Sequence, residues 1–361
     1  MDVADPRRDR RRARATCASL LALGLLASCS SSDGPDSSTR RDLDAGTVAA
    51  GPVARSRAIF DAIGPSDPFC TVAVLRDDEV VFAEAYGSDD DGEVAPDTPV
   101  DLASVSKQFT GVAIELLIDD GELDGSDLVG DLVPASRPAT DDLTVDELLT
   151  HTSGLADYTE LLPQEDDEVA TQDDAVAAIA TSEPTGARGT FEYSNSNYVL
   201  LAEVVEAVSG RALPEFLDDE VFEPLDLDMA VDPQGPWLQI GDGSIWTTPT
   251  ELVTWSSQYW DQSLDGPDLR TAMFDPEVDA SDDPDADPDL TEEWYGSGVL
   301  RGTTDDGSEV LFHDGSWDGY ETDWALLPDE QLAAAVTCDE EAELSEDAPA
   351  SALLAIWEPE R

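Results

Sequence analysis

Lysine is almost absent from this sequence of 361 residues, in which Lys107 is the only one, and histidine occurs only twice. Residues 42–361 add nine arginines. Proteins that bind nucleic acid neutralise phosphates with clustered Lys and Arg, so this scarcity excludes nucleic acid as a partner. His151 and His313 are isolated and no Cys or His cluster has metal-ligand spacing, so we expect neither a metal nor another cofactor.

Acidic residues dominate the composition instead. The formal net charge is -64 at pH 7, with 82 Asp and Glu against 18 Lys and Arg. A hydrophobic content of 41% and eight Trp exclude a wholly disordered acidic chain. A surface of like charges repels itself in dilute buffer, whereas molar salt shortens the Debye length to about 3 Å. We therefore hypothesise a salt-adapted protein, with an ordinary acidic secreted protein as the alternative.

The first 29 residues have the features of an export signal. A basic region at residues 7–14 precedes an apolar stretch, Leu20–Ala27, that is too short to span a bilayer as a mature helix. Leu26-Ala27-Ser28-Cys29 resembles the lipobox of bacterial lipoproteins, in which the cysteine carries the lipid. We expect a lipoprotein-type signal peptide over residues 1–29, a membrane anchor at Cys29 and a flexible tether over residues 30–54. A plain cleaved signal peptide is the alternative.

Two cysteines remain for the folded part of the chain, Cys70 and Cys338. Each lies at the end of a predicted strand. A location outside the cytoplasm, at the cell envelope, permits a disulfide between them. Two separate buried thiols are the alternative.

Predicted strands lie at both ends of the body of the chain, and predicted helices lie between them. The strand candidates are residues 69–75, 79–86, 294–301, 309–313, 320–327 and 331–338. The helix candidates are residues 104–119, 197–208, 248–260 and 349–357, with a short helix after a capping box at Thr144. Residues 276–290 lack any period and are expected to form a solvated acidic loop.

This order of elements predicts a mixed α/β fold of the α+β type over residues 55–361. One antiparallel sheet would be assembled from the N- and C-terminal strands and flanked by helices. A mostly helical lobe would be inserted between the two groups of strands.

Ser104 lies three residues before Lys107, at the start of a predicted helix. Positions i and i+3 are neighbours on a helix, so the Lys107 amine can reach the Ser104 hydroxyl that it would activate. The N-terminus of a helix also favours negative charge that develops near Ser104. Because Ser is a common residue, this pair alone is a weak signal.

Two further short motifs carry side chains that suit a hydrolytic site. Tyr193-Ser194-Asn195 immediately precedes a predicted helix, so its side chains can face a cleft; a core Tyr beside a capping Asn is the alternative. His313-x-Gly315 ends a predicted strand, where Gly allows a substrate backbone to approach. A capping or surface His is the alternative there. We interpret His151 as structural, holding a turn through its ring hydrogen bonds.

Ser104-x-x-Lys107, Tyr193-x-Asn195 and His313-x-Gly315 occur in an order that resembles the class C β-lactamase and DD-peptidase-like serine hydrolase family. Residues 101–110, 148–155 and 241–255 are also similar to family segments. The resemblance covers roughly residues 55–361.

The resemblance implies that Ser104 attacks an amide, lactam or ester carbonyl and forms an acyl-enzyme. It also implies that Lys107 and Tyr193 share the proton transfers, and that Asn195 orients Lys107 and the substrate. The backbone N–H groups of Ser104 and Ser316 would form the oxyanion hole. We expect a monomer that acts on a small-molecule, peptide or ester substrate.

His313 stands where the β-lactamases usually have a lysine. Such a lysine binds the carboxylate of penicillins, which a mostly neutral His holds weakly. The expected activity is therefore that of an esterase, a D-amino-acid peptidase or an amidase, on neutral or cationic substrates. A β-lactamase or D-Ala-D-Ala carboxypeptidase is the first alternative. A non-catalytic, penicillin-receptor-like binding protein of the envelope is the second.

The negative charge of the body should raise the pKa of Lys107 and keep the amine protonated, which opposes a role as base. Burial and salt screening would oppose that effect. If Lys107 stays protonated, Tyr193 is the better base, with Lys107 stabilising its phenolate.

Overall fold

The computed structural model describes residues 51–89, 92–162, 170–233, 237–284, 286–317, 319–342, 344 and 348–358. The predicted signal peptide, Cys29 and most of the predicted tether lie outside the described residues. Helix α1 (Pro52–Ile59) begins inside the range expected for the tether, so regular structure starts before residue 55. Within the described residues, no helix is long and apolar enough to cross a membrane.

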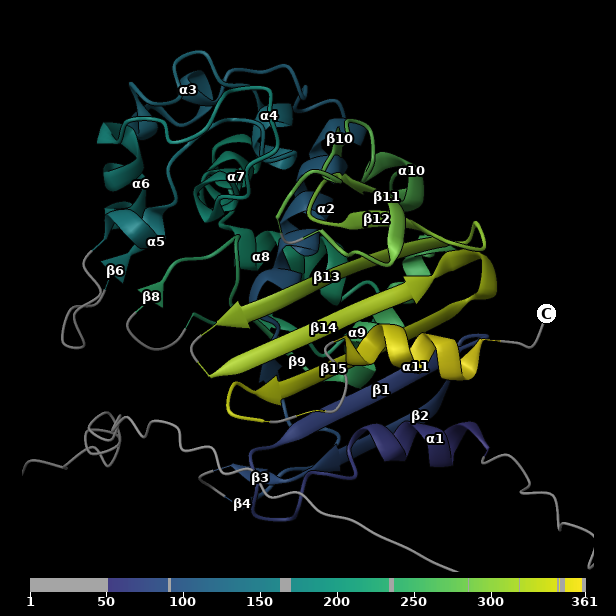
Figure 1. Ribbon diagram of the computed structural model, residues 1–361. Coiled ribbons are helices and arrows are strands. Elements are labelled where there is room, and N and C mark those ends of the chain that lie inside the picture. Colours follow the sequence, from purple (N-terminus) through teal and green to yellow (C-terminus); the bar gives the residue numbers. More distant parts are fainter. Residues whose placement is uncertain are drawn as a thin grey trace, which may run out of the picture. The chain divides into compact units, whose positions relative to one another are not determined.

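An eight-stranded antiparallel sheet has the strand order β10-β11-β12-β13-β14-β15-β1-β2 (Figure 1). Its strands are β1 (Cys70–Arg76), β2 (Glu79–Tyr86), β10 (Val278–Asp279), β11 (Leu290–Tyr295), β12 (Leu300–Thr304), β13 (Glu309–Trp317), β14 (Tyr320–Leu327) and β15 (Leu332–Asp339). The pairing of β1 with β15 joins the two ends of the chain in one sheet. The predicted antiparallel sheet of N- and C-terminal strands is confirmed.

Short strands form smaller sheets away from this one. They are β3 (Ser88–Asp89) with β4 (Gly92–Glu93), β6 (Ala170–Thr171) with β8 (Trp237–Leu238), and β9 (Ile245–Thr247) between β5 (Val100–Asp101) and β7 (Ala230–Val231).

The helices α2 to α10 come from the middle of the chain. They are α2 (Lys107–Asp119), α3 (Val129–Leu132), α4 (Val145–Leu149), α5 (Tyr158–Leu161), α6 (Gln172–Thr181), α7 (Asn195–Ser209), α8 (Leu213–Leu217), α9 (Pro249–Trp255) and α10 (Leu269–Ala272). The capping box predicted at Thr144 is present at the start of α4. Helices α3 to α7 gather in a lobe beside the β13 side of the sheet (Figure 1).

The middle of the sheet is buried on both faces. Alternate residues of β1 show this, because Ala73 packs in one cluster with the helices of the lobe while Val72 packs in another with α1 and α11 (Pro349–Trp357). Since side chains alternate between the faces of a strand, a strand covered on both faces is apolar throughout. Strand β1 is buried at every position up to Leu75.

Two predicted strands have different limits in the structure. The strand predicted at 294–301 is wrong, because these residues belong to β11 and β12 and to the turn between them, Gly296–Gly298. Gly298 has a φ of +87°, and a Cβ there would lie 2.5 Å from the Lys107 carbonyl oxygen. Glycine therefore allows this turn to pack on the start of α2. The strand predicted at 309–313 continues to Trp317, since β14 pairs with it from Leu311 to Trp317.

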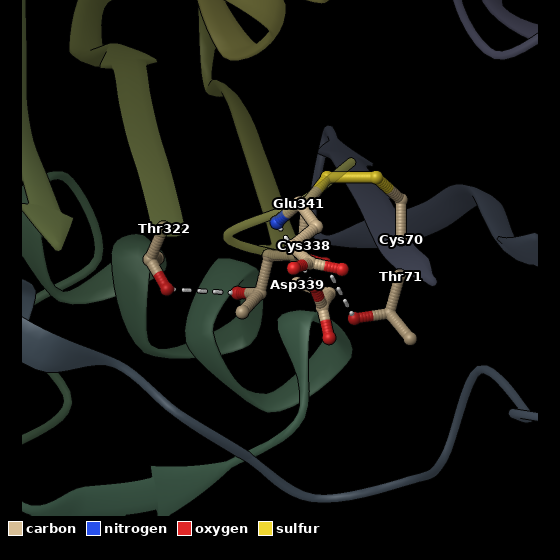
Figure 2. Close-up of a disulfide and its surroundings, with 7 residues drawn as sticks. Cys70, Thr71, Thr322, Cys338, Asp339 and Glu341 are labelled. Carbon is tan, nitrogen blue, oxygen red and sulfur yellow. Dashed lines mark hydrogen bonds between the residues drawn. A yellow bond between two sulfur atoms is a disulfide. The ribbon is translucent and has the colours of Figure 1, made fainter. Parts of the chain in front are cut away.

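Cys70 and Cys338 are joined by a disulfide, with their Cα atoms 4.0 Å apart. They are paired in register between β1 and β15. Figure 2 shows the bridge at the ends of these two strands. It links residues that are 268 positions apart in the sequence.

Candidate active site

Ser104 lies in a 3₁₀ turn, Ala103–Ser106, that leads directly into α2. The residue before it, Ala103, has a φ of +48°, and the Asp101 carboxylate accepts its N–H at 2.9 Å. Backbone strain of this kind is concentrated at functional sites, where surrounding contacts hold it in place. The predicted helix at 104–119 therefore begins as a tighter turn, which brings residues i and i+3 into line.

Lys107 is fully buried, and its Nζ atom has three hydrogen-bond partners. They are Ser104 Oγ at 2.9 Å, Asn195 Oδ1 at 2.8 Å and the Asp242 carbonyl oxygen at 2.7 Å. Burial lowers the pKa of Lys107 to about 8, although the charges of Asp242, Asp157 and Asp314 act to raise it. Of the two opposing effects expected from the sequence, desolvation of the amine thus outweighs the charge of the carboxylates.

Asn195 is the first residue of α7, and Asp157 fixes its orientation. The Asp157 carboxylate accepts hydrogen bonds from the backbone N–H of Asn195 at 2.8 Å and from its Nδ2 at 3.0 Å. Because a carboxylate oxygen accepts from the amide nitrogen, Oδ1 of Asn195 is the atom that faces Lys107.

Tyr193 lies in the loop before α7, next to both Ser104 and Lys107. Its ring centroid is 5.1 Å from Lys107 Nζ. Burial raises the pKa of Tyr193 well above its ordinary value, and a hydrogen bond with Ser104 partly opposes this. The residue is nevertheless 37% exposed. Its phenol is thus neutral at physiological pH and remains accessible from one side.

Behind Tyr193, His151 is fully buried and its ring nitrogens link two elements. Its Nδ1 accepts from the Ser194 N–H at 3.1 Å, so the proton of the neutral ring is on Nε2, which lies 3.2 Å from the Tyr295 hydroxyl. Burial holds the pKa of His151 well below its ordinary value. The ring therefore fixes the backbone of the Tyr193-Ser194-Asn195 motif.

His313 lies within β13 rather than at its end, and it is buried. Its Nδ1 lies 2.5 Å from the Asp314 carbonyl oxygen, so Nδ1 donates and Nε2 accepts from the Tyr295 hydroxyl at 3.4 Å. Burial lowers the pKa of His313. The ring is thus neutral and is held by protein groups on both nitrogens.

Gly315 lets β13 approach the backbone of Ser104. A Cβ at this position would lie 2.7 Å from the Ser104 nitrogen and 2.8 Å from the Leu102 oxygen. Only glycine fits such a close approach without a backbone shift. The neighbouring Ser316 is exposed, because successive side chains of a strand point to opposite faces.

A small pocket beside Ser104 is lined by several residues that belong to no motif in the sequence. Its lining includes Tyr158, Gln239, Asp242, Ser244 and Trp317, together with Ser104 and Asn195. Asp242 lies in the segment 241–255, whose only signal in the sequence is its resemblance to a family segment. Among the described residues, no group of three or more His, Cys, Asp or Glu side chains is arranged to hold a metal ion.

The structure therefore brings together Ser104, Lys107, Tyr193, Asn195 and Gly315. The family model for beta-lactamases matches residues 68–356. The chain belongs to the beta-lactamase family.

Known relatives are similar to this chain at moderate sequence identity. The protein flp of Staphylococcus aureus (strain MW2) is 25% identical over 307 residues, which cover 74% of this chain and 59% of flp. The chain thus spans less than two thirds of that relative.

Solved structures show the same fold. A D-stereospecific amidohydrolase from Streptomyces sp. is 20% identical with a TM-score of 0.69, over 85% of this chain and 99% of that one. An octameric penicillin-binding protein homologue from Pyrococcus abyssi is 22% identical with a TM-score of 0.67, over 84% and 75% of the two chains.

Proposed function

We propose that this chain is an exported serine hydrolase that cleaves an ester or amide bond through an acyl-enzyme on Ser104. The observation that carries the proposal is the buried Lys107 amine, which bonds Ser104 Oγ, Asn195 Oδ1 and the Asp242 carbonyl. A lysine with a lowered pKa beside a hydroxyl is the arrangement that activates a serine nucleophile.

Lys107 is the general base in this proposal. Asn195 Oδ1 and the Asp242 carbonyl can only accept hydrogen bonds, so a neutral amine donates both of its protons to them. Its lone pair then points at the Ser104 hydroxyl, whose proton it takes. Tyr193, with its raised pKa, stays protonated and bonds Ser104 as a neutral phenol.

With these groups, hydrolysis proceeds in two steps, formation of an acyl-enzyme on Ser104 and its hydrolysis by water. Ser104 Oγ bonds to the carbonyl carbon as its proton passes to Lys107, and the C–N or C–O bond to the leaving group then breaks as that group takes up a proton through Tyr193 or Lys107. Water next attacks the ester, Ser104 regains its proton, and the acid is released. The backbone N–H groups of Ser104 and Ser316 stabilise the oxyanion that forms in acylation and again in deacylation.

The charges around the site favour an ester or amide without a carboxylate near the scissile bond. His313 is neutral and held by protein groups, and Asp157 and Asp242 lie beside Lys107. A substrate carboxylate would meet like charges there, which disfavours a β-lactamase or D-Ala-D-Ala carboxypeptidase. A D-stereospecific amidohydrolase has the same fold, which supports the amidase or D-amino-acid peptidase type.

Export, the lipid anchor at Cys29 and the monomeric state are part of the proposal. The disulfide between Cys70 and Cys338 supports export, because disulfides persist in oxidising compartments. Mass spectrometry of membrane-extracted protein tests the anchor, which is wrong if Cys29 carries no lipid.

Labelling with a fluorophosphonate tests the activity itself. We expect the wild type to be labelled on Ser104, found by peptide mapping, and Ser104→Ala to be unlabelled and inactive on a short-chain ester. Ser106→Ala, two residues away, is the matched control and should label. An unlabelled wild type in both dilute and molar salt would favour the non-catalytic binding protein.

A further inference from the structure

Tyr295, the last residue of β11, is fully buried behind the candidate active site. Its hydroxyl oxygen lies 3.2 Å from His151 Nε2 and 3.4 Å from His313 Nε2. These are the two histidines of the chain, and they come from distant segments, the turn after α4 and strand β13. Tyr295 therefore bridges two parts of the chain that each border the nucleophile.

The tautomers of the two histidines fix the direction of this bridge. Nε2 of His151 carries a proton and Nε2 of His313 does not, because backbone groups determine both tautomers at Nδ1. His151 thus donates to the Tyr295 oxygen, and the Tyr295 hydroxyl donates to His313. Tyr198 also borders this hydroxyl, and its own proton goes to the Leu149 carbonyl at 2.9 Å. Each proton of the bridge therefore has an acceptor.

On the His151 side, the bridge leads to the Tyr193 phenol. The His151 ring packs against the Tyr193 ring. The Tyr295 ring lies edge-on to both rings, with its centroid 4.8 Å from that of His151 and 6.3 Å from that of Tyr193. Ring contacts hold planes but let rings slide, whereas a directional hydrogen bond fixes where His151 lies within its plane.

On the His313 side, the bridge leads to the stretch of β13 that passes Ser104. Gly315 follows His313 by two residues, and a Cβ there would lie 2.7 Å from the Ser104 nitrogen. Two residues of an extended strand leave little slack, so a shift of His313 is passed on to this close approach.

The turn that follows Tyr295, Gly296–Gly298, packs on α2. A Cβ on Gly111 would lie 1.9 Å from the Ser297 carbonyl oxygen, and the Ser297 hydroxyl donates to Glu115 at 2.7 Å. Tyr295 and this turn thus contact the elements that carry Lys107, the Tyr193 loop and β13. A shift of the Tyr295 hydroxyl would change how these elements meet.

We propose that Tyr295 is a positioning residue, which keeps the Tyr193 phenol aligned with Ser104 through the hydrogen bonds of its hydroxyl to both histidines. Reacting groups must be held within about 0.5 Å of the productive geometry, which requires hydrogen bonds behind them. The Tyr193 phenol gives its proton to the leaving group, and the proton that Lys107 took from Ser104 replaces it. Misalignment of the phenol therefore slows departure of the leaving group. This inference rests on the proposed function.

The test compares two esters of the same acid, one of an alkyl alcohol and one of 4-nitrophenol. An alkoxide must take up a proton to leave, whereas 4-nitrophenolate leaves as an anion. We expect Tyr295→Phe to lower kcat/KM on the order of 10-fold for the alkyl ester and less than about 3-fold for the nitrophenyl ester. Tyr259→Phe also removes a buried hydroxyl, which bonds Gln108 at 3.3 Å, and as the matched control should leave the ratio of the two rates unchanged.

A double-variant cycle shows whether Tyr295 acts through Tyr193. Tyr193→Phe should lower the ratio of alkyl to nitrophenyl rates further than Tyr295→Phe does, because it removes the proton donor itself. Adding Tyr295→Phe to Tyr193→Phe should then change the ratio by less than about 2-fold, since the effects of coupled residues do not add. If Tyr295→Phe does not fold, His313→Leu breaks the same bridge from β13 and should lower the ratio in the same way.

Two results would overturn the inference while the fluorophosphonate still labels Ser104 and the proposed function stands. One is a folded Tyr295→Phe whose ratio equals that of the wild type. The other is an effect of Tyr295→Phe on the ratio that persists undiminished in Tyr193→Phe. If Ser104 of the wild type is not labelled, the proposed function fails and this inference fails with it.

Discussion

The His151 ring stacks on the Tyr193 ring, with centroids 4.3 Å apart and an interplanar angle of 25°. The same His151 accepts hydrogen bonds on Nδ1 from the Ser194 N–H at 3.1 Å and from Asn197 Nδ2 at 2.9 Å. A residue remote from the substrate thus sets both the plane of the Tyr193 ring and the path of the motif that carries it.

We predict that His151→Phe keeps the stacking but loses these hydrogen bonds. Buried donors left unpaired cost about 1–3 kcal/mol each, so the free energy of unfolding should fall by about 2–4 kcal/mol. Loss of alignment should lower kcat/KM for a neutral ester by on the order of 10-fold or more. Guanidinium denaturation and ester hydrolysis measure the two effects. Phe191→Leu, which removes ring contacts to His151 and Tyr295 but leaves the hydrogen bonds of His151 in place, is the control and should retain most of the activity.

The pH dependence of activity should report Lys107. The amine is charged below its lowered pKa of about 8 and can accept a proton only above it, so kcat/KM should rise with pH through about 8. The pH profile of a neutral ester, corrected for spontaneous hydrolysis, measures this.

Tyr193→Phe separates the two candidate bases. If Lys107 is the base, this variant is slower but keeps a midpoint near 8. A wild-type midpoint near or above 10 that disappears in Tyr193→Phe would instead assign the base to Tyr193.

Glu115 is a buried carboxyl group outside the candidate active site. It accepts a hydrogen bond from the Ser297 hydroxyl at 2.7 Å, and burial raises its pKa to about 7. The folded state therefore binds this proton more tightly than the unfolded state, and the stability that results is lost as the pH rises through about 7.

Glu115→Gln removes the buried charge at similar volume. We expect it to raise the free energy of unfolding by about 1–3 kcal/mol near pH 9 and to change it little near pH 5. Glu122→Gln, on an exposed residue, is the matched control. An equal effect of Glu115→Gln at both pH values would contradict the raised pKa.

The disulfide should contribute strongly to stability, because it closes a loop between residues 268 positions apart. Restricting so long a loop in the unfolded chain is worth about 2–5 kcal/mol. The double variant Cys70→Ala, Cys338→Ala should lose that amount in guanidinium denaturation. Reduced wild type is the companion measurement, and an unchanged midpoint in both samples would refute the prediction.

Salt dependence tests the adaptation that the composition suggests. Seven arginines of the described residues already form ion pairs with carboxylates, namely Arg57, Arg76, Arg137, Arg188, Arg211, Arg270 and Arg301. Most carboxylates therefore depend on solution ions for screening. We expect Tm in molar KCl to exceed that in dilute buffer by at least about 5 °C. Equal stability and activity in both would favour an ordinary acidic protein.

The sheet and the cluster formed by Ser104, Lys107, Tyr193 and Asn195 were largely predictable from sequence. The strands of the sheet follow apolar runs bounded by turns, and the helix at 349–357 has the predicted limits. The strand predicted at 294–301 failed because Gly296–Gly298 is a turn inside an otherwise strand-like run. The alternation of apolar and polar residues along the chain does not reveal that this turn packs on Lys107.

The pocket could not be predicted from local sequence. Asp242 and Gln239 carry no motif of their own, and they reach Ser104 only because the turn around Gly241 packs against α7. The pKa of Lys107 has the same origin. This pKa is lowered because distant segments of the chain bury the amine, and the net charge of the sequence does not indicate that burial.

The position of β15 next to β1 also limits when this protein can fold. A chain still emerging from a ribosome or a translocation pore has made β1 and β2 but lacks the strand that covers the other edge of β1. The apolar edge Cys70–Leu75 stays open to misassembly until the last strand arrives. The chain therefore completes its sheet only after nearly all of its residues have been made.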